Sequence, residues 1–260
     1  MTQPDHTEFL AFAETLADIS RDMLLKAAKQ KLDIEIKADA SFVTTTDKAV
    51  ETALRTRILE TYPDHGILGE EFPSVNTDAE FVWVLDPIDG TAPFIAGIPV
   101  YGTLISLAWK GAPWLGVIDH PVTSDRWTGV AHEFARHNGT PVKVRTCGAL
   151  EQALVTCSNA DFMAADARAR FDVIRKRAQY VQYGGSCYAY GVMASGRTDL
   201  GVDGGMDAFD VYAPAAVILG AGGHFCDWQG QPLSFDMDGH VLAAGDKSLL
   251  DEALAILSGA

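Results

Sequence analysis

The sequence lacks an excess of basic residues, which limits the partners it can bind. Lysine and arginine together number 20, against 35 aspartate and glutamate residues, and the formal net charge is −15. Binding to a nucleic-acid backbone needs clustered Lys and Arg, so we expect no nucleic-acid partner. No apolar run approaches the roughly 18 residues of a membrane span, so we expect no membrane partner.

Signals for secretion, disulfide bonding and zinc binding are also missing. The N-terminus, MTQPDHTEFL, has neither a basic start nor an apolar segment, and the four cysteines form no CxxC pair. These features predict a cytoplasmic protein with reduced thiols. The seven histidines show no HExxH or HxxxH spacing, so we interpret them as surface or packing residues.

The sequence does contain a large apolar fraction and regular periodicity. Hydrophobic residues make up 48% of the chain, enough for a full core. Residues 7–30 have the spacing of an amphipathic helix, residues 34–37 read as a strand, and a second helical pattern ends at Pro63. Consecutive strands follow from residue 81. This order predicts an antiparallel sheet covered by helices.

The second half of the chain alternates between strand and helix patterns. The alternation begins near residue 153 and ends with a helix over residues 247–257. It predicts an α/β layer, so the fold class is mixed α/β (α+β). We place the boundary between the halves at residue 145, giving segments 1–145 and 146–260 of one compact unit.

Acidic residues stand beside predicted turns in four segments. These are Asp47, Glu70 with Glu71, Asp86 with Asp89, and Asp207 with Asp210. In the segment FVWVLDPIDGT (81–91), an apolar strand ends in two of these aspartates. Charge is costly to bury unless it is paired or bound to metal, and hard cations such as Mg²⁺ take oxygen ligands. A turn containing Pro87 allows the Ile88 carbonyl to face the same point.

The residues after this turn, Gly90 to Pro93, read as the start of a helix. Glycine allows close backbone approach, and a helix N-terminus offers free N–H groups to an anion. A metal and a helix N-terminus at one place are typical of a phosphate site. Taken alone, a DxxD pattern fits a surface acidic turn better. The apolar strand before it and the other acidic turns favour the functional interpretation.

Three motifs together resemble one known family. GEE (69–71), DPIDGT (86–91) and DAFDVYAPAAVILGAGG (207–223) resemble the inositol-monophosphatase family of Mg²⁺-dependent phosphatases. KADASFVTTTD (37–47) is similar to that family's lysine-to-TD stretch, and the likeness covers about residues 8–245. The resemblance implies a layered αβαβα sandwich with its site between the halves. It also implies a homodimer and inhibition by Li⁺.

The resemblance further implies which residues bind two or three Mg²⁺ ions. Glu70, Asp86 and the carbonyl of Ile88 would hold the first ion. Asp86, Asp89 and Asp210 would hold the second. A third, weaker ion would lie near Glu70.

The resemblance also implies the roles of the remaining site residues. Gly90 and Thr91 would bind phosphate through backbone N–H groups. Thr91 and Asp47 would orient and deprotonate the attacking water, so that Asp47, Thr91 and Glu70 form the catalytic set.

Other residues were open to two interpretations. Ser186 stands at a helix start; a nucleophile is one reading, and a wall of the substrate pocket, binding substrate, is the other. Asp203 would contact substrate or be an ordinary loop carboxylate. Asp207 would be a ligand or a helix cap. Lys37 matches the family's lysine approximately, and Cys187 reads as a buried thiol or a site residue.

Several longer stretches, among them RWTGVA and YGGSCYAYGVMASGRTDL, resemble the histidinol-phosphate phosphatase branch of the family. This predicts hydrolysis of L-histidinol phosphate to L-histidinol and phosphate, a step of histidine biosynthesis. Alternatives are an inositol-1-phosphate phosphatase or another sugar or nucleotide phosphatase of the family. A different class would be a regulatory protein that binds metal and phosphate without turnover.

Overall fold

The computed structural model describes residues 4–37 and 42–259. Its helices are α1 (Thr7–Ala27), α2 (Thr45–Thr61), α3 (Thr91–Ala96), α4 (Ala165–Arg177), α5 (Ser186–Ala194), α6 (Ala208–Gly220) and α7 (Lys247–Leu257). Its strands are β1 (Ile34–Ile36), β2 (Phe42–Thr44), β3 (Gly66–Gly69), β4 (Phe81–Asp89), β5 (Gly102–Trp109), β6 (Ala112–His120), β7 (Asp125–Val130), β8 (Phe134–His137), β9 (Thr140–Val142), β10 (Leu154–Cys157), β11 (Tyr180–Tyr183), β12 (Leu200–Asp203), β13 (His224–Asp227) and β14 (Val241–Ala244). Two short 3₁₀ helices cover Leu150–Gln152 and Ala160–Phe162.

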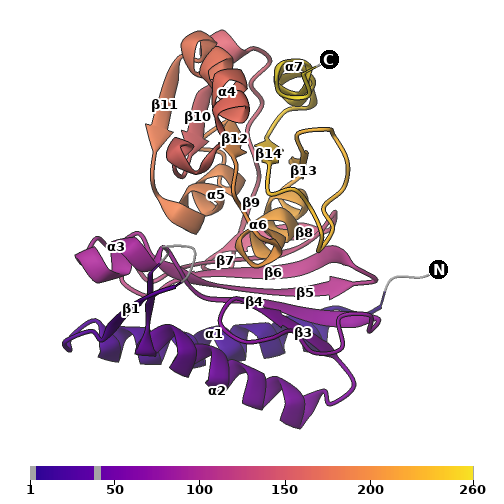
Figure 1. The fold of residues 1–260 in the computed structure, drawn as a ribbon. Helices are drawn as coiled ribbons and strands as arrows, with labels where there is room; N and C mark the ends of the chain where they lie inside the picture. Colours follow the sequence, from indigo (N-terminus) through magenta and orange to yellow (C-terminus); the bar gives the residue numbers. More distant parts are fainter. Residues whose placement is uncertain (1–3, 38–41, 260) are drawn as a thin grey trace.

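The strands form two large sheets between layers of helices. One sheet has the order β3-β4-β5-β6-β7-β8-β9, and the other has the order β11-β10-β12-β14-β13. Helices α1 and α2 cover one face of the larger sheet, α5 and α6 lie between the sheets, and α4 and α7 cover the outer face of the smaller sheet (Figure 1). This is the predicted layered αβαβα sandwich.

The apolar run in β4 is continuous because both faces of this strand are buried. Trp83 and Leu85 belong to the core shared with α1 and α2. Val82 and Val84 point to the opposite face and pack in the core shared with α5 and α6. Alternating side chains of one strand therefore contribute to two cores. The strand is held rigidly where it reaches Asp86 and Asp89.

Helix α6 packs very closely on the larger sheet, and two glycines permit this. A Cβ on Gly116 would lie 2.5 Å from the Ala213 carbonyl oxygen, and a Cβ on Gly129 would lie 2.6 Å from the Val217 Cα. Any larger residue would push the helix away. The close approach fixes α6 against β6 and β7 and so fixes the position of Asp210 in its first turn.

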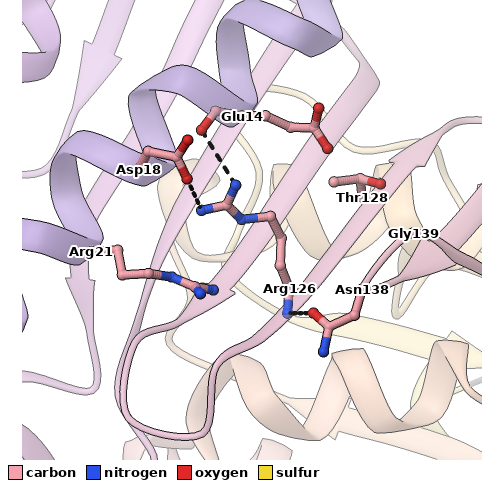
Figure 2. Close-up of a pocket in the computed structure, with 7 residues that line it drawn as sticks. All are labelled: Glu14, Asp18, Arg21, Arg126, Thr128, Asn138 and Gly139. Carbon is pink, nitrogen blue, oxygen red and sulfur yellow. Dashed lines mark hydrogen bonds and ion pairs between the residues drawn. The ribbon is translucent and has the colours of Figure 1, made fainter.

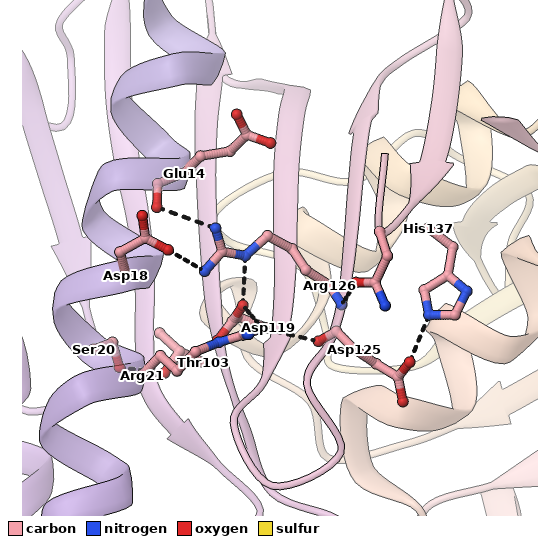
Figure 3. Close-up of polar contacts among 10 residues, drawn as sticks. Glu14, Asp18, Ser20, Arg21, Thr103, Asp119, Asp125, Arg126 and His137 are labelled. Atoms are coloured by element: carbon pink, nitrogen blue, oxygen red, sulfur yellow. Dashed lines mark hydrogen bonds and ion pairs between the residues drawn. The ribbon is translucent and has the colours of Figure 1, made fainter. Parts of the chain in front are cut away.

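Helix α1 is joined to the same sheet by a partly buried ion-pair network (Figure 3). The Asp119 carboxylate is fully buried and accepts hydrogen bonds from Arg21 and Arg126. Arg126 also binds Asp18 of α1 at 2.7 Å. A cavity of about 220 Å³ lies beside these groups (Figure 2). Three of its four charged lining residues, Arg21, Arg126 and Asp18, are paired with protein groups, so we assign the network a structural role.

The structure differs from the sequence-based expectations in a few places. Strands β2, β3, β8, β9 and β13, of three or four residues each, were not predicted from the sequence. The pairing of β3 with β4 is parallel, in an otherwise antiparallel sheet. Helix α1 ends at Ala27, before the expected residue 30, and α4 begins at Ala165, after the expected residue 162.

The boundary near residue 145 stays a prediction. The larger sheet ends at Val142, and the smaller one begins at Leu154. Helix α6, however, belongs to the second half of the chain and packs on the first sheet. Within residues 4–37 and 42–259, no helix is long and apolar enough to cross a bilayer.

Candidate active site

Three of the predicted metal ligands converge at the end of β4. Asp86 and Asp89 lie on this strand, where the pairing with β5 shifts register between them. Asp210 comes from the first turn of α6. One oxygen from each of these carboxylates lies within 4.8 Å of the other two. Asp210 is thus brought to the two aspartates of β4, which lie 121 and 124 positions earlier in the sequence.

Hydrogen bonds from neighbouring elements hold this acidic group in place. The Thr103 hydroxyl of β5 donates to the Pro87 carbonyl at 2.9 Å, between the two aspartates of β4. The Cys187 backbone N–H donates to Asp89 Oδ2 at 2.6 Å. The Asp207 backbone N–H donates to Asp210 Oδ2 at 2.7 Å. Asp207 is exposed and occupies the N-cap position of α6, as the cap interpretation expected.

The electrostatics of the group favour a bound cation. Asp86 is 1% exposed, and its Oδ1 has no hydrogen-bond partner. Burial and then the negative charges of Glu70, Asp89 and Asp210 raise the pKa of Asp86 well above its usual value. Burial and the charge of Asp89 do the same for the pKa of Asp210. Clustered carboxylate oxygens with an unpaired buried acceptor suit a hard divalent cation such as Mg²⁺.

Glu70 lies beside this group, in contact with a cation of the protein itself. Lys37 Nζ lies 2.8 Å from Glu70 Oε1 and 2.8 Å from Glu71 Oε1. Burial raises the pKa of Glu70 to about 7, although Lys37 opposes the shift. Sequence patterns did not predict this pairing, because Lys37 lies 33 residues from Glu70. Residues 38–41 of the stretch that resembles the family lie outside the described residues.

Asp47 and Thr91 meet near Glu70, whose pKa the negative charge of Asp47 raises. Asp47 Oδ2 accepts hydrogen bonds from the backbone N and side-chain hydroxyl of Thr44, at 2.8 and 2.6 Å. The Thr91 hydroxyl lies 3.3 Å from Asp47 Oδ1 and 3.1 Å from the Ile88 carbonyl oxygen, so it can donate to either. Burial raises the pKa of Asp47, against the effect of the Thr44 bonds. The hydroxyl and carboxylate thus form a pair that can handle a proton.

Gly90 lies between Asp89 and Thr91 in the sequence. It caps α3 with φ of +82°, a left-handed conformation that glycine adopts at low cost. The Ser186 hydroxyl would lie 2.7 Å from a Cβ at this position. Ser186 therefore packs directly on the backbone of the DPIDGT segment, and its predicted contact with substrate stays a prediction.

Asp203 lies in a buried network instead of an open pocket. Its Oδ1 accepts from the Ser158 backbone N at 2.6 Å, and its Oδ2 accepts from the Tyr190 hydroxyl at 2.6 Å. Asp203 as a whole is 3% exposed. Both oxygens are therefore engaged by protein groups. The predicted contact of Asp203 with substrate stays a prediction, and this geometry does not favour it.

Sequence reasoning did not foresee the role of Cys187 and His120. Cys187 Sγ lies 3.2 Å from His120 Nε2, and both residues are buried. Burial lowers the pKa of His120 to about 4, so the ring is neutral near pH 7. His120 is a packing residue, as the histidine spacing suggested, but it packs against the residue that binds Asp89. The consecutive glycines before Ser186 were the one sequence signal of an unusual turn here.

The comparisons with known proteins agree with this geometry. The model of the inositol monophosphatase family matches residues 5–259. A solved structure of an inositol monophosphatase from Zymomonas mobilis superimposes with a TM-score of 0.89 at 37% identity, covering 98% of this chain and 100% of that one.

Curated relatives carry several names. The chain is 38% identical to the bifunctional phosphatase IMPL2, chloroplastic, of Arabidopsis thaliana, over 96% of this chain and 75% of that protein. It is 32% identical to a histidinol-phosphatase of Chlorobaculum parvum, over 92% of both chains. It is 29% identical to an inositol monophosphatase of Mesembryanthemum crystallinum. Together with the fold and the acidic group at the end of β4, these matches establish that the chain belongs to the inositol monophosphatase family of phosphatases.

Proposed function

We propose that this protein hydrolyses a small phosphomonoester in a Mg²⁺-dependent reaction and that its substrate is L-histidinol phosphate. The observation that carries the proposal is the close group formed by the buried Asp86 and the half-buried Asp89 and Asp210. A phosphate dianion is repelled by so acidic a site unless cations are present. The phosphatase activity follows from the family. The identity of the metal, the number of bound ions and the substrate are what we propose.

The residues that would hold two or three Mg²⁺ ions are Glu70, Asp86, Asp89, Asp210 and the carbonyl of Ile88. When bound, the ions would neutralise charge on the phosphoryl group and lower the pKa of a bound water. Glu70 would have to exchange its contact with Lys37 for a contact with metal. That exchange is possible because the Lys37 side chain is 23% exposed and also has Glu71 as a partner.

Asp47 and Thr91 would manage the attacking water. The Thr91 hydroxyl would accept a hydrogen bond from the water and pass its own proton towards Asp47 Oδ1, 3.3 Å away. The raised pKa of Asp47 makes this carboxylate a stronger base than an exposed aspartate. The backbone N–H groups of Gly90 and Thr91 would contact the phosphate, as the resemblance implies.

The substrate proposal depends on charge. L-Histidinol phosphate carries an ammonium group and an imidazole near its phosphate, so its pocket needs carboxylates beyond the metal ligands. Asp207 is exposed beside Asp210 and is available for such a contact. Among the described residues, Lys37 is the cation that contacts the acidic group, and it does so through Glu70. A second phosphate on the substrate would need further Lys or Arg side chains, so this arrangement does not favour bisphosphate substrates. Relatives named histidinol-phosphatase support the same assignment.

Inositol 1-phosphate is the second candidate substrate. The structural match to the Zymomonas mobilis inositol monophosphatase, at 37% identity, favours it specifically. Inositol is a neutral polyol, so a carboxylate outside the metal site would add little to its binding. The two candidates therefore differ in their expected dependence on Asp207.

The deciding experiment compares kcat/KM for L-histidinol phosphate, inositol 1-phosphate, fructose 1,6-bisphosphate and 3′-phosphoadenosine 5′-phosphate. L-Histidinol phosphate should lead, and Asp207→Asn should reduce that lead without equally reducing the rate on inositol 1-phosphate. Asp78→Asn, at an exposed acid before the opposite end of β4, is the matched control and should change neither. A preference of tenfold or more for inositol 1-phosphate, about 1.4 kcal/mol in transition-state binding, would refute the substrate assignment.

A further inference from the structure

We propose that the contact between Cys187 and His120 positions the first turn of α5 so that it holds Asp89 in the orientation of a metal ligand. The inference rests on the proposed function, because it concerns the metal site of that function. Cys187 and His120 are positioning residues in this account. Neither is expected to touch substrate.

The starting point is how Asp89 is held. Its Oδ2 accepts a hydrogen bond of 2.6 Å from the Cys187 backbone N–H. Asp89 lies on β4, in the larger sheet, whereas Cys187 lies on α5, in the layer between the sheets. The orientation of this carboxylate therefore depends on where α5 begins relative to the sheet.

The turn that leads into α5 has an unusual backbone. Gly184, Gly185 and Ser186 have consecutive positive φ values of 75°, 103° and 47°. Ser186 carries a Cβ, so its left-handed conformation costs free energy. Such conformations persist where the surrounding structure enforces them, and they are concentrated at functional sites. Some contact after the turn must therefore fix the start of the helix.

The contact between Cys187 and His120 meets that requirement. Cys187 Sγ lies 3.2 Å from His120 Nε2, and the two residues are 2% and 1% exposed. His120 is the last residue of β6, so the contact joins α5 to the larger sheet. A Cβ on Gly102 would lie 3.1 Å from the His120 ring, so glycine at this position leaves room for the imidazole.

The next residue of α5 strengthens the same junction. The Tyr188 ring meets the His120 ring edge to face at 4.8 Å between centroids. Its hydroxyl donates to Asp125 Oδ2 at 2.9 Å, at the start of β7. Two successive side chains of α5 thus contact β6 and β7. As a result, the backbone N–H of Cys187 is directed at Asp89.

A buried cysteine is usually a small hydrophobic residue, and alanine then replaces it at little cost. The present geometry predicts a different outcome, since groups that orient metal ligands typically alter metal affinity when they are removed. Cys187→Ala keeps the backbone N–H but loses the contacts of the thiol with His120 and with the Asp89 carboxylate, whereas His120→Ala removes the first contact alone. The metal affinity of the substrate-free protein therefore separates the two interpretations.

The experiment measures Mn²⁺ binding to the full chain without substrate, by the electron paramagnetic resonance signal of free Mn²⁺. Cys187→Ala and His120→Ala should each weaken binding about tenfold. The double variant should be no weaker than the worse single variant, because both changes break the same contact. Cys187→Ser retains a polar side chain and should recover most of the affinity. Cys226→Ala, at a buried thiol on β13, is the matched control and should bind as wild type does.

The outcomes distinguish the inference from the proposed function. Unchanged Mn²⁺ affinity in Cys187→Ala overturns the inference while leaving the metal site intact. Equal weakening in Cys226→Ala, or no recovery in Cys187→Ser, also overturns it, because the effect is then general loss of packing. If the wild-type protein binds no Mn²⁺, the metal site of the proposed function fails and this inference fails with it.

Discussion

Replacing Asp86 by asparagine should stabilise the metal-free protein and destabilise the metal-bound one relative to wild type. Asp86 is buried, its Oδ1 is unpaired, and its carboxylate faces those of Asp89 and Asp210. Asparagine has nearly the same shape and no charge. Its amide can also donate to a neighbouring carboxylate. Without metal, the substitution removes repulsion; with metal, it removes a ligand.

The magnitude follows from the spacing of the group. Two unit charges at the limiting separation of 4.8 Å repel by about 3.5 kcal/mol at an effective dielectric constant of about 20. Protonation and side-chain relaxation already relieve part of this repulsion in the wild-type protein. We therefore expect Asp86→Asn to raise the free energy of unfolding by about 1–3 kcal/mol at pH 8 in chelator. Each kcal/mol should raise Tm by about 2–4 °C in a chain of this size.

The effect should depend on pH with a definite sign. Burial and the neighbouring carboxylates raise the pKa of Asp86 in the folded protein well above its usual value. Below about pH 3, the folded and unfolded states both keep the proton, so wild type pays no penalty. As pH rises, the unfolded state ionises first and the folded wild type loses stability. The advantage of Asp86→Asn should therefore grow from pH 4 towards pH 8.

The assay is urea unfolding of both proteins with chelator and with saturating Mg²⁺. Mg²⁺ at about 100 times its Kd should stabilise wild type by about 2.7 kcal/mol and should stabilise the variant far less. Asp119→Asn is the matched control, since Asp119 is equally buried but paired with Arg21 and Arg126 (Figure 3). It should destabilise the protein by about 3 kcal/mol or more under both conditions. The reasoning is refuted if Asp86→Asn is less stable than wild type in chelator at pH 8.

Three further predictions test the rest of the site. Thr91→Val should lower kcat about 100-fold or more while Mn²⁺ affinity changes little, because the hydroxyl that links water to Asp47 is lost; a parallel loss of Mn²⁺ affinity would contradict this. The affinity for Mg²⁺, measured by calorimetry, should fall as pH falls below about 7. Burial raises the pKa of Glu70 to about 7, and a protonated carboxyl does not bind cations. An affinity that stays constant between pH 6 and 8 would argue against Glu70 as a ligand. Gly90→Ala should destabilise the protein by about 1–2 kcal/mol in urea unfolding and abolish phosphate release, because φ is +82° and the new Cβ would lie 2.7 Å from the Ser186 hydroxyl; wild-type stability would show that the turn tolerates a side chain.

Local sequence patterns, together with motifs that resemble a known family, were sufficient to predict the layers of the fold and the convergence of Asp86, Asp89 and Asp210. The two-sided burial of β4 shows in the unbroken apolar run before Asp86, and the alternation of strand and helix after residue 145 shows the second sheet. The DPIDGT segment and the pattern around Asp210 identify which carboxylates meet. These features are carried by residues close together in the chain, or by motifs that a known family shares.

The contacts that tune the site could not be predicted in this way. Lys37 with Glu70, and Cys187 with His120, are pairs separated by 33 and 67 residues, and they meet only through the packing of whole layers. Asp203 illustrates the same limit. Its position in the sequence suggested a substrate contact, but its two oxygens are directed to groups that only the folded second sheet brings near.

The most direct test of the central claim is phosphate release from a panel of small phosphomonoesters by wild type and by Asp89→Asn, each with Mg²⁺ and with chelator. We predict release by wild type with Mg²⁺, with L-histidinol phosphate turned over fastest, and no release in chelator. Asp89→Asn should be folded and inactive under both conditions. Activity that persists in chelator, or equal inertness of wild type and Asp89→Asn towards every ester, would contradict the account; the second result would favour a protein that binds metal and phosphate without turnover.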